Sequence, residues 1–109
     1  MEFSVSVKTS QVDDHIRERV ERRLYFTLGR FQRRIGRIRV RLEDTNGPKG
    51  GVDQRCRIVV RLHGRRNVVI DQLDANIDAA LNRAAYRAGR AVARRLDRPW
   101  RPKVYRRRF

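Results

Sequence analysis

The sequence has little cysteine, little histidine and no long apolar run. Its one cysteine, Cys56, cannot form a disulfide within the chain, and two scattered histidines give no zinc-binding cluster. No run of 18 apolar residues is present to cross a membrane, and the N-terminal segment MEFSVSVKTS lacks the basic-then-apolar order of a secretory signal. We therefore expect a cytoplasmic protein with no metal, no other cofactor and no membrane partner.

Signatures of catalysis are also scarce. The chain contains neither the P-loop pattern nor a Gly-x-Ser-x-Gly elbow. Asp71, Asp74 and Asp78 are close in sequence, but they fall where a helix is expected to begin, with Asp74 as its N-cap and Asp78 near the positive end of its dipole. His15 and His63 have no evident partner. Without a general acid and base, we expect no enzyme activity and no small-molecule substrate.

Acidic residues are outnumbered by basic ones. The 28 Lys and Arg residues oppose 12 Asp and Glu, which gives a net charge of +16. All the basic residues are arginine except Lys8, Lys49 and Lys103. A general preference for arginine can account for that ratio but not for the net charge. Such an excess is typical of a domain that binds a polyanion, and the planar guanidinium group suits phosphates and can stack on bases.

Two segments have the apolar spacing of amphipathic helices. A first helix is predicted from about Val12 to about Arg34, with an N-cap at Ser10 and a terminator at Gly36. A second is predicted over Leu73–Leu96. The residues expected to face the core are Ile16, Val20, Leu24, Leu28 and Phe31 in the first helix and Ile77, Leu81, Ala84, Ala88 and Val92 in the second.

Alternating apolar and polar residues predict strands over 2–8, 37–42 and 55–62, and a fourth beginning at Val68. The even-numbered residues of the second and third strands, Cys56 among them, form one apolar face, and arginines occupy the other. The order is β-α-β-β-β-α. We therefore predict an α+β two-layer sandwich, in which two helices pack on one face of a four-stranded sheet. The domain is expected over residues 1–96, followed by a mobile basic, aromatic tail over 97–109.

A row of cations follows one side of the second predicted helix. Arg83, Arg87, Arg90 and Arg94 recur about one turn apart with almost no acidic neighbours. Like charges at this spacing repel, so a bound nucleic acid would compensate them. Tyr86 lies beside the row and is either a base-stacking residue or an ordinary surface aromatic. A basic flank of the first helix holds Arg19, Arg22, Arg30 and Arg33, with Phe26 among them.

Two other basic regions compete with the helices. The outer face of the sheet carries arginines where an RNA-binding sheet would have exposed aromatics, so it is expected to be a solvated face or a secondary contact. In the tail, Trp100 either stacks on a base or folds onto the core. The tail residues with possible RNA contacts are Trp100, Tyr105, Arg106, Arg107 and Arg108.

The order of elements and the spacing in the second helix resemble a known family. Asp74 is followed by Ile77-Asp78, by Arg83 five positions after that aspartate, and then by Arg87 and Arg90. Over residues 2–96 the chain is similar to the ribosome hibernation-promoting factors, also called ribosome-associated inhibitors or sigma-54 modulation proteins, in their short form. The resemblance implies a fold like that of double-stranded-RNA-binding domains. We expect the short form, without the second, dimerising domain of the longer members.

The resemblance also implies a function. Family members bind 16S rRNA in the channel of the small ribosomal subunit that mRNA and tRNA use, so they inhibit translation and preserve idle 70S ribosomes in stationary phase or stress. The matching RNA-binding positions are Arg83, Arg87 and Arg90, with Arg22, Arg23, Arg30, Arg33 and Arg34 on the first helix. The alternative is a general RNA- or DNA-binding protein, chaperone-like, with the same fold.

Overall fold

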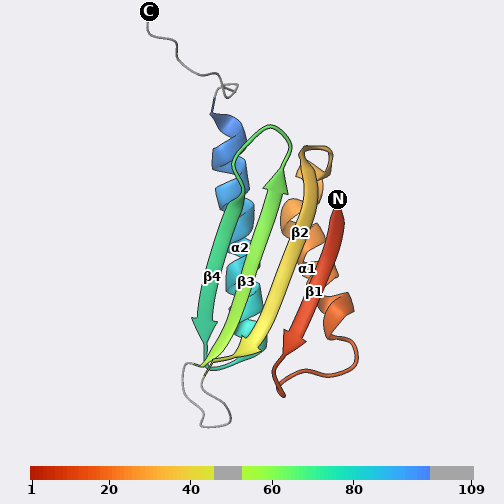
Figure 1. Ribbon diagram of the computed structural model, residues 1–109, viewed down its shortest axis with the longest axis vertical. Coiled ribbons are helices and arrows are strands. Elements are labelled where there is room, and N and C mark those ends of the chain that lie inside the picture. Colours follow the sequence, from red (N-terminus) through yellow and green to blue (C-terminus); the bar gives the residue numbers. More distant parts are fainter. Residues whose placement is uncertain (46–52, 99–109) are drawn as a thin grey trace, which may run out of the picture.

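The computed structural model describes residues 1–45 and 53–98. Their elements, in chain order, are β1 (Glu2–Lys8), α1 (Ile16–Leu28), the 3₁₀ helix η1 (Gly29–Arg34), β2 (Ile35–Asp44), β3 (Gln54–Leu62), β4 (Val68–Asp74) and α2 (Ile77–Asp97). Figure 1 shows one sheet with both α-helices on the same side, α2 behind β3 and β4 and α1 behind β1 and β2. The predicted α+β sandwich is confirmed.

The four strands lie in the sheet in the order in which they occur along the chain. β1 runs parallel to β2, with Val5 beside Val40, because α1 carries the chain back across the sheet between them. β2 with β3 and β3 with β4 are antiparallel pairs. The β3–β4 turn contains Gly64, whose φ of 71° is a left-handed conformation that glycine adopts without strain.

The core lies between the sheet and the two helices. All five residues of the second predicted helix that were expected to face the core are buried, and so are four of the five in the first. The fifth, Phe31, lies in η1 and packs half-buried against the core. The apolar even-numbered residues of β2 and β3 form the sheet side of the core, as their alternation predicted. Cys56 is one of them, and burial, assisted by the charge of Asp71, raises the pKa of its thiol to about 12.

The first helix differs from its prediction at both ends. It begins at Ile16 rather than near Val12, and Ser10 does not cap it; instead, the carboxylate of Asp13 accepts a hydrogen bond from the His15 backbone at 2.9 Å. The α-helix ends at Leu28, and the chain continues as η1. Gly36 is no helix terminator, because it lies in β2 at a shift of register. The side chain of His63 passes so close that a Cβ on Gly36 would lie 3.1 Å from it.

The second helix begins later than expected. Leu73 and Asp74 extend β4, and the N-cap of α2 is Asn76, whose side chain accepts a hydrogen bond from the Ala79 backbone at 3.0 Å. Gln11, from the segment before α1, accepts a second one from the Ile77 backbone at 2.9 Å. Asp78 does occupy the first turn of α2, where the helix dipole favours a carboxylate.

At the C-terminal end, α2 reaches Asp97. The expected tail residues beyond Arg98 lie outside the described residues. None of the described helices is long and apolar enough to cross a membrane.

Candidate nucleic-acid interface

The nine arginines predicted on the helices are all exposed on α1, η1 or α2. Arg22 and Arg23 lie on α1; Arg30, Arg33 and Arg34 follow on η1; and Arg83, Arg87, Arg90 and Arg94 lie on α2. Only one of the nine, Arg83, has an acidic partner among the described residues, with Nη1 3.8 Å from the carboxylate of Asp74. The helix side of the molecule therefore presents cations that the protein itself hardly neutralises.

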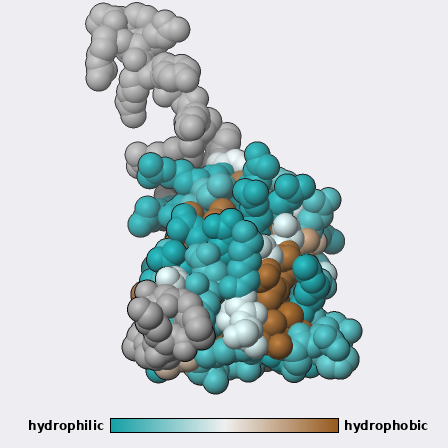
Figure 2. Space-filling model, turned by 60° about the horizontal axis from the view of Figure 1, so that its bottom comes forward, coloured by the Kyte–Doolittle hydropathy of each residue, from teal (hydrophilic) through white to brown (hydrophobic). Residues whose placement is uncertain are grey.

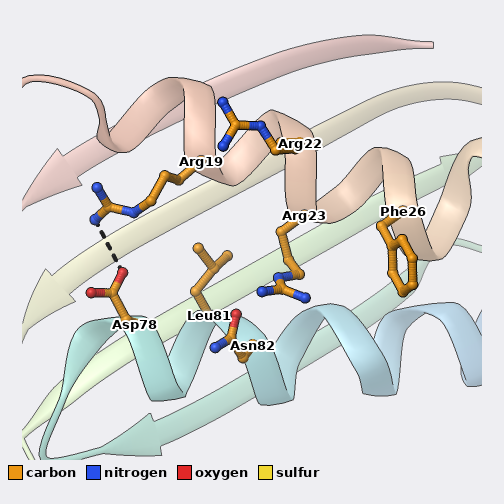
Figure 3. A pocket seen from close by; sticks show the side chains of 7 residues that line it. All are labelled: Arg19, Arg22, Arg23, Phe26, Asp78, Leu81 and Asn82. Atoms are coloured by element: carbon orange, nitrogen blue, oxygen red, sulfur yellow. Dashed lines mark hydrogen bonds and ion pairs between the residues drawn. The ribbon is translucent and has the colours of Figure 1, made fainter.

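The side chains from α1 and α2 enclose a first hollow of about 390 Å³ near the start of α2. Figure 3 shows Arg23 and Phe26 pointing from α1 toward α2, while Asn82 and Leu81 approach them from α2. Asp78 lies at one end of this hollow and is bonded to Arg19. Arg23 thus places a cation near the amide of Asn82, a pair suited to a phosphate group, while Arg22 lines the hollow with its guanidinium group turned away from α2 (Figure 3).

Arg19, part of the predicted basic flank of α1, has a structural role. Its guanidinium group donates to the carboxylates of Asp13 at 2.9 Å and Asp78 at 3.1 Å, so it joins the segment before α1 to the start of α2. The hydrogen bond to Asp13, together with that to Asp78, raises the pKa of Arg19 above the usual value for arginine. The pKa of Asp13 is lowered by the hydrogen bond from the His15 backbone and by Arg19. Arg19 is therefore already neutralised.

A second hollow, of about 530 Å³, continues along the two helices beyond Phe26. Arg30 enters it from η1, and Arg90 and Arg94 enter from α2. The hydroxyl of Tyr86 accepts a hydrogen bond from Arg90 at 3.1 Å. Arg90 and Arg94 of the predicted row therefore face the space between the helices, together with the η1 cation.

Arg83 and Arg87, the other members of that row, lean toward β4. Arg87 donates to the backbone oxygen of Asp71 at 3.0 Å and to the side chain of Gln72 at 2.8 Å. Arg83 lies near Asp74, as described above. The four arginines therefore form two pairs with different surroundings, and Arg83 alone among them has an acidic neighbour in the described part of the chain.

The outer face of the sheet is more nearly neutral than its arginine content suggests. Acidic residues on neighbouring strands pair with three of its arginines: Glu2 with Arg37, Glu43 and Asp71 with Arg55, and Asp71 with Arg57. The side chains of the other three, Arg39, Arg41 and Arg61, have no hydrogen bond or ion pair with a described residue. Figure 2, which looks at the lower end of the molecule, shows hydrophilic side chains over most of the visible surface. The sheet remains a possible secondary contact.

The structure brings together residues whose proximity the sequence did not reveal. Thr27, Gly89 and Ala93 line the second hollow, and Asn82 lines the first. The only signal for them was the small residues Gly89 and Ala93, four positions apart on α2. The predicted tail contacts, Trp100, Tyr105, Arg106, Arg107 and Arg108, lie outside the described residues.

An α+β sandwich whose two helices present one basic, aromatic-containing surface has the properties of an RNA-binding domain. The model of the family described as sigma 54 modulation protein / S30EA ribosomal protein matches residues 3–99. The chain belongs to this family. Searching curated protein sequences gave no match.

Solved structures have the same fold. The N-terminal domain of Protein Y from Thermus thermophilus is 27% identical, with a TM-score of 0.68 over 86% of this chain and 98% of that one. A ribosomal subunit interface protein from Coxiella burnetii is 11% identical, with a TM-score of 0.69 over 86% of this chain and 96% of that one. This second likeness concerns the fold alone.

Proposed function

We propose that this chain binds the small ribosomal subunit, on 16S rRNA in the channel used by mRNA and tRNA, and that it blocks translation by occupying that channel. It would act in the cytoplasm as a hibernation factor, holding idle 70S ribosomes inactive in stationary phase or stress. Membership of a family described as ribosomal supports a ribosomal partner.

One observation carries the proposal: the exposed arginines of α1, η1 and α2 that the protein leaves without acidic partners. Arg22, Arg23, Arg30, Arg90 and Arg94 all line the two hollows between the helices. Unneutralised cations on a rigid surface are suited to the phosphate groups of folded RNA. Binding would release the counterions of the RNA, and no catalytic step is needed, because occupation of the channel excludes mRNA and tRNA by itself.

Sedimentation with purified small subunits and whole ribosomes tests the proposal. The full chain should travel with both particles at low salt. If six to ten phosphates are contacted, affinity should fall roughly a thousandfold or more between about 50 and 200 mM salt. A chain that stays at the top of the gradient at low salt would overturn the proposal. Addition of the chain to a translating extract should also lower protein synthesis.

Competition separates this function from the alternative, a general RNA- or DNA-binding chaperone. A ribosome-specific protein should remain on small subunits in the presence of excess tRNA or duplex DNA. A general binder would be displaced by either competitor in proportion to its phosphate concentration, because phosphate contacts carry no sequence information.

A further inference from the structure

Two aromatic rings face the second hollow between the helices. Phe26 of α1 is 83% exposed and Tyr86 of α2 is 59% exposed, and both line the same space of about 530 Å³. Single exposed apolar residues are ordinary on protein surfaces. Two rings from facing helices that share one hollow are a more specific feature, since neither contributes to the core.

The hollow exists because α2 presents small residues to α1 at this point. A Cβ on Gly89 would lie 3.0 Å from the backbone oxygen of Thr27 and 3.3 Å from its Cβ. The helices thus approach closely at Gly89, and the neighbouring Ala93 adds little bulk. The base of the hollow is therefore formed by small residues, and Phe26 and Tyr86 remain exposed beside it.

Cations surround the rings, and the described residues that line this hollow include no carboxylate. The Arg90 guanidinium lies 5.8 Å from the centre of the Tyr86 ring and donates to its hydroxyl. Arg94 and Arg30 complete the basic rim. The first hollow differs, because Asp78 lies in it and already binds Arg19. The second hollow thus combines flat apolar surfaces with positive charge that no nearby acid offsets.

We propose that this hollow is a subsite for one unpaired nucleotide of RNA, whose base stacks on Phe26 and Tyr86 while Arg90 and Arg94 hold its phosphate. Under the proposed function, on which the source of the nucleotide rests, it is taken from ribosomal RNA. An RNA duplex would meet the arginines but leave the rings unused, because its bases are stacked on one another. An unpaired base offers the flat face that exposed aromatic side chains bind.

A short single-stranded RNA containing the fluorescent base 2-aminopurine tests the subsite, since the emission of this base falls when it stacks. The full chain should bind the strand and quench its fluorescence. Phe26→Ala and Tyr86→Ala should each weaken binding roughly 5- to 100-fold and lose most of the quenching. Phe26→Leu, which retains apolar bulk but no ring, should lose the quenching as well.

Tyr25→Ala is the matched control. Tyr25 neighbours Phe26 and is 49% exposed, but its ring packs near Phe3, with the ring centres 5.6 Å apart, outside the hollow. The Tyr25→Ala variant should bind the labelled strand and quench its fluorescence as the unaltered chain does. Circular dichroism should show that all variants fold. Unchanged affinity and quenching in both Phe26→Ala and Tyr86→Ala would overturn the subsite, as would equally tight binding of a strand made abasic at the labelled position.

Sedimentation with small subunits keeps this inference separate from the proposed function. If the chain ignores small subunits but stacks the labelled base in the manner expected, the ribosomal function fails and the RNA subsite stands. If the Phe26 and Tyr86 variants sediment with small subunits as tightly as the unaltered chain and quenching is unaffected, the subsite fails and the function stands.

Discussion

Arg65 and Arg95 exchange hydrogen bonds between the β3–β4 turn and the last turn of α2. Nη1 of Arg65 donates to the backbone oxygen of Arg95 at 3.1 Å. In return, Nη1 of Arg95 donates to the backbone oxygens of Arg66 and Asn67 at 2.9 and 3.0 Å. Arg65 also reaches the backbone oxygen of Arg98 at 2.8 Å. These two cations satisfy carbonyl groups at the end of a helix and in a turn, so we assign them to stability and not to RNA binding.

Removal of this exchange should lower stability without weakening the proposed binding to small subunits. Arg65→Ala should lower the free energy of unfolding by about 1 to 2 kcal/mol, because it removes two charged hydrogen bonds to backbone carbonyls, one of them part-buried. Arg95→Ala should lower it by about 1 kcal/mol, because both of its bonds are exposed. The double variant should cost less than the sum, since both side chains serve one contact. Urea denaturation measures these values.

Arg66→Ala is the control for the Arg65–Arg95 exchange. The Arg66 side chain is exposed and makes no hydrogen bond with a described residue, so its removal should change the free energy of unfolding by less than about 0.5 kcal/mol. Equal losses in all three single variants would show that the exchange contributes nothing particular. A large loss of small-subunit binding in Arg65→Ala would show that this residue contributes to the proposed RNA contact as well.

The close approach of the helices at Gly89 predicts a second effect on stability. Gly89→Ala places a methyl group 3.0 Å from the Thr27 backbone oxygen, so α1 and α2 must separate. We expect a loss of about 1 to 3 kcal/mol from this overpacking, reduced by up to about 1 kcal/mol because alanine favours a helix. Thermal or urea unfolding measures the result.

Gly29→Ala is the matched substitution for Gly89→Ala. Gly29 has helical backbone angles, and its added methyl group would meet only Tyr25, at an ordinary contact distance of 3.5 Å. This variant should be neutral or more stable by about 0.4 to 1 kcal/mol, since alanine restricts the unfolded chain. If both variants gain stability, the helices are free to separate and the contact at Thr27 does not constrain them.

The fold was largely predictable from sequence because apolar periodicity determines which residues are buried. The stripe from Ile77 to Val92 and the even-numbered residues of β2 and β3 gave the layers and the core correctly. Helix ends were predicted less well. The carboxylate of Asp13 and the side chains of Gln11 and Asn76 satisfy the backbone groups there, and Gln11 reaches α2 from a segment distant in sequence.

The site was predictable as a charge distribution and not as a set of contacts. Sequence spacing identified the arginines of α2, but it could not separate Arg87, which binds β4, from Arg94, which has no partner among the described residues. It also placed Arg19 in the basic flank, although Asp13 and Asp78 neutralise it. Which cations remain available for RNA depends on neighbours brought together only by folding.

The buried thiol of Cys56 predicts a decrease in stability at high pH. Its pKa is about 12 in the folded protein and near 9.0 when the chain is unfolded. Between these values the unfolded chain releases a proton that the folded chain retains, so stability must fall as pH rises. For this one group the loss is about 1.4 kcal/mol per pH unit above pH 9.

Comparison with Cys56→Ala isolates this effect from the titration of tyrosine and lysine. Between pH 8 and pH 10 the unaltered chain should lose about 1.4 kcal/mol more than the variant, although the variant is less stable at both values because it leaves a cavity. Urea denaturation at the two pH values measures the difference. Parallel behaviour of the two proteins would mean that the thiol ionises as readily when folded as when unfolded.

Two matched sets of three arginines test which side of the molecule makes the proposed contact with ribosomal RNA. Arg22, Arg23 and Arg94 lie on the helices, and Arg39, Arg41 and Arg61 lie on the outer sheet face. None of the six side chains has a hydrogen bond or ion pair with a described residue. Changing either set to alanine removes the same charge. If the helices bind the phosphates, only the helix triple should weaken small-subunit binding strongly, by about tenfold or more.

The salt dependence of binding gives the same test a second measurement. Loss of three phosphate contacts should reduce the slope of log affinity against log salt by about 2 to 3 in the helix triple, whereas the sheet triple should keep the original slope. Affinities from sedimentation at several salt concentrations supply both values. A reduced slope in the sheet triple and an unchanged one in the helix triple would instead assign the ribosomal contact to β2 and β3. Arg39, Arg41 and Arg61 would then bind RNA, and the hollows between the helices would face away from it.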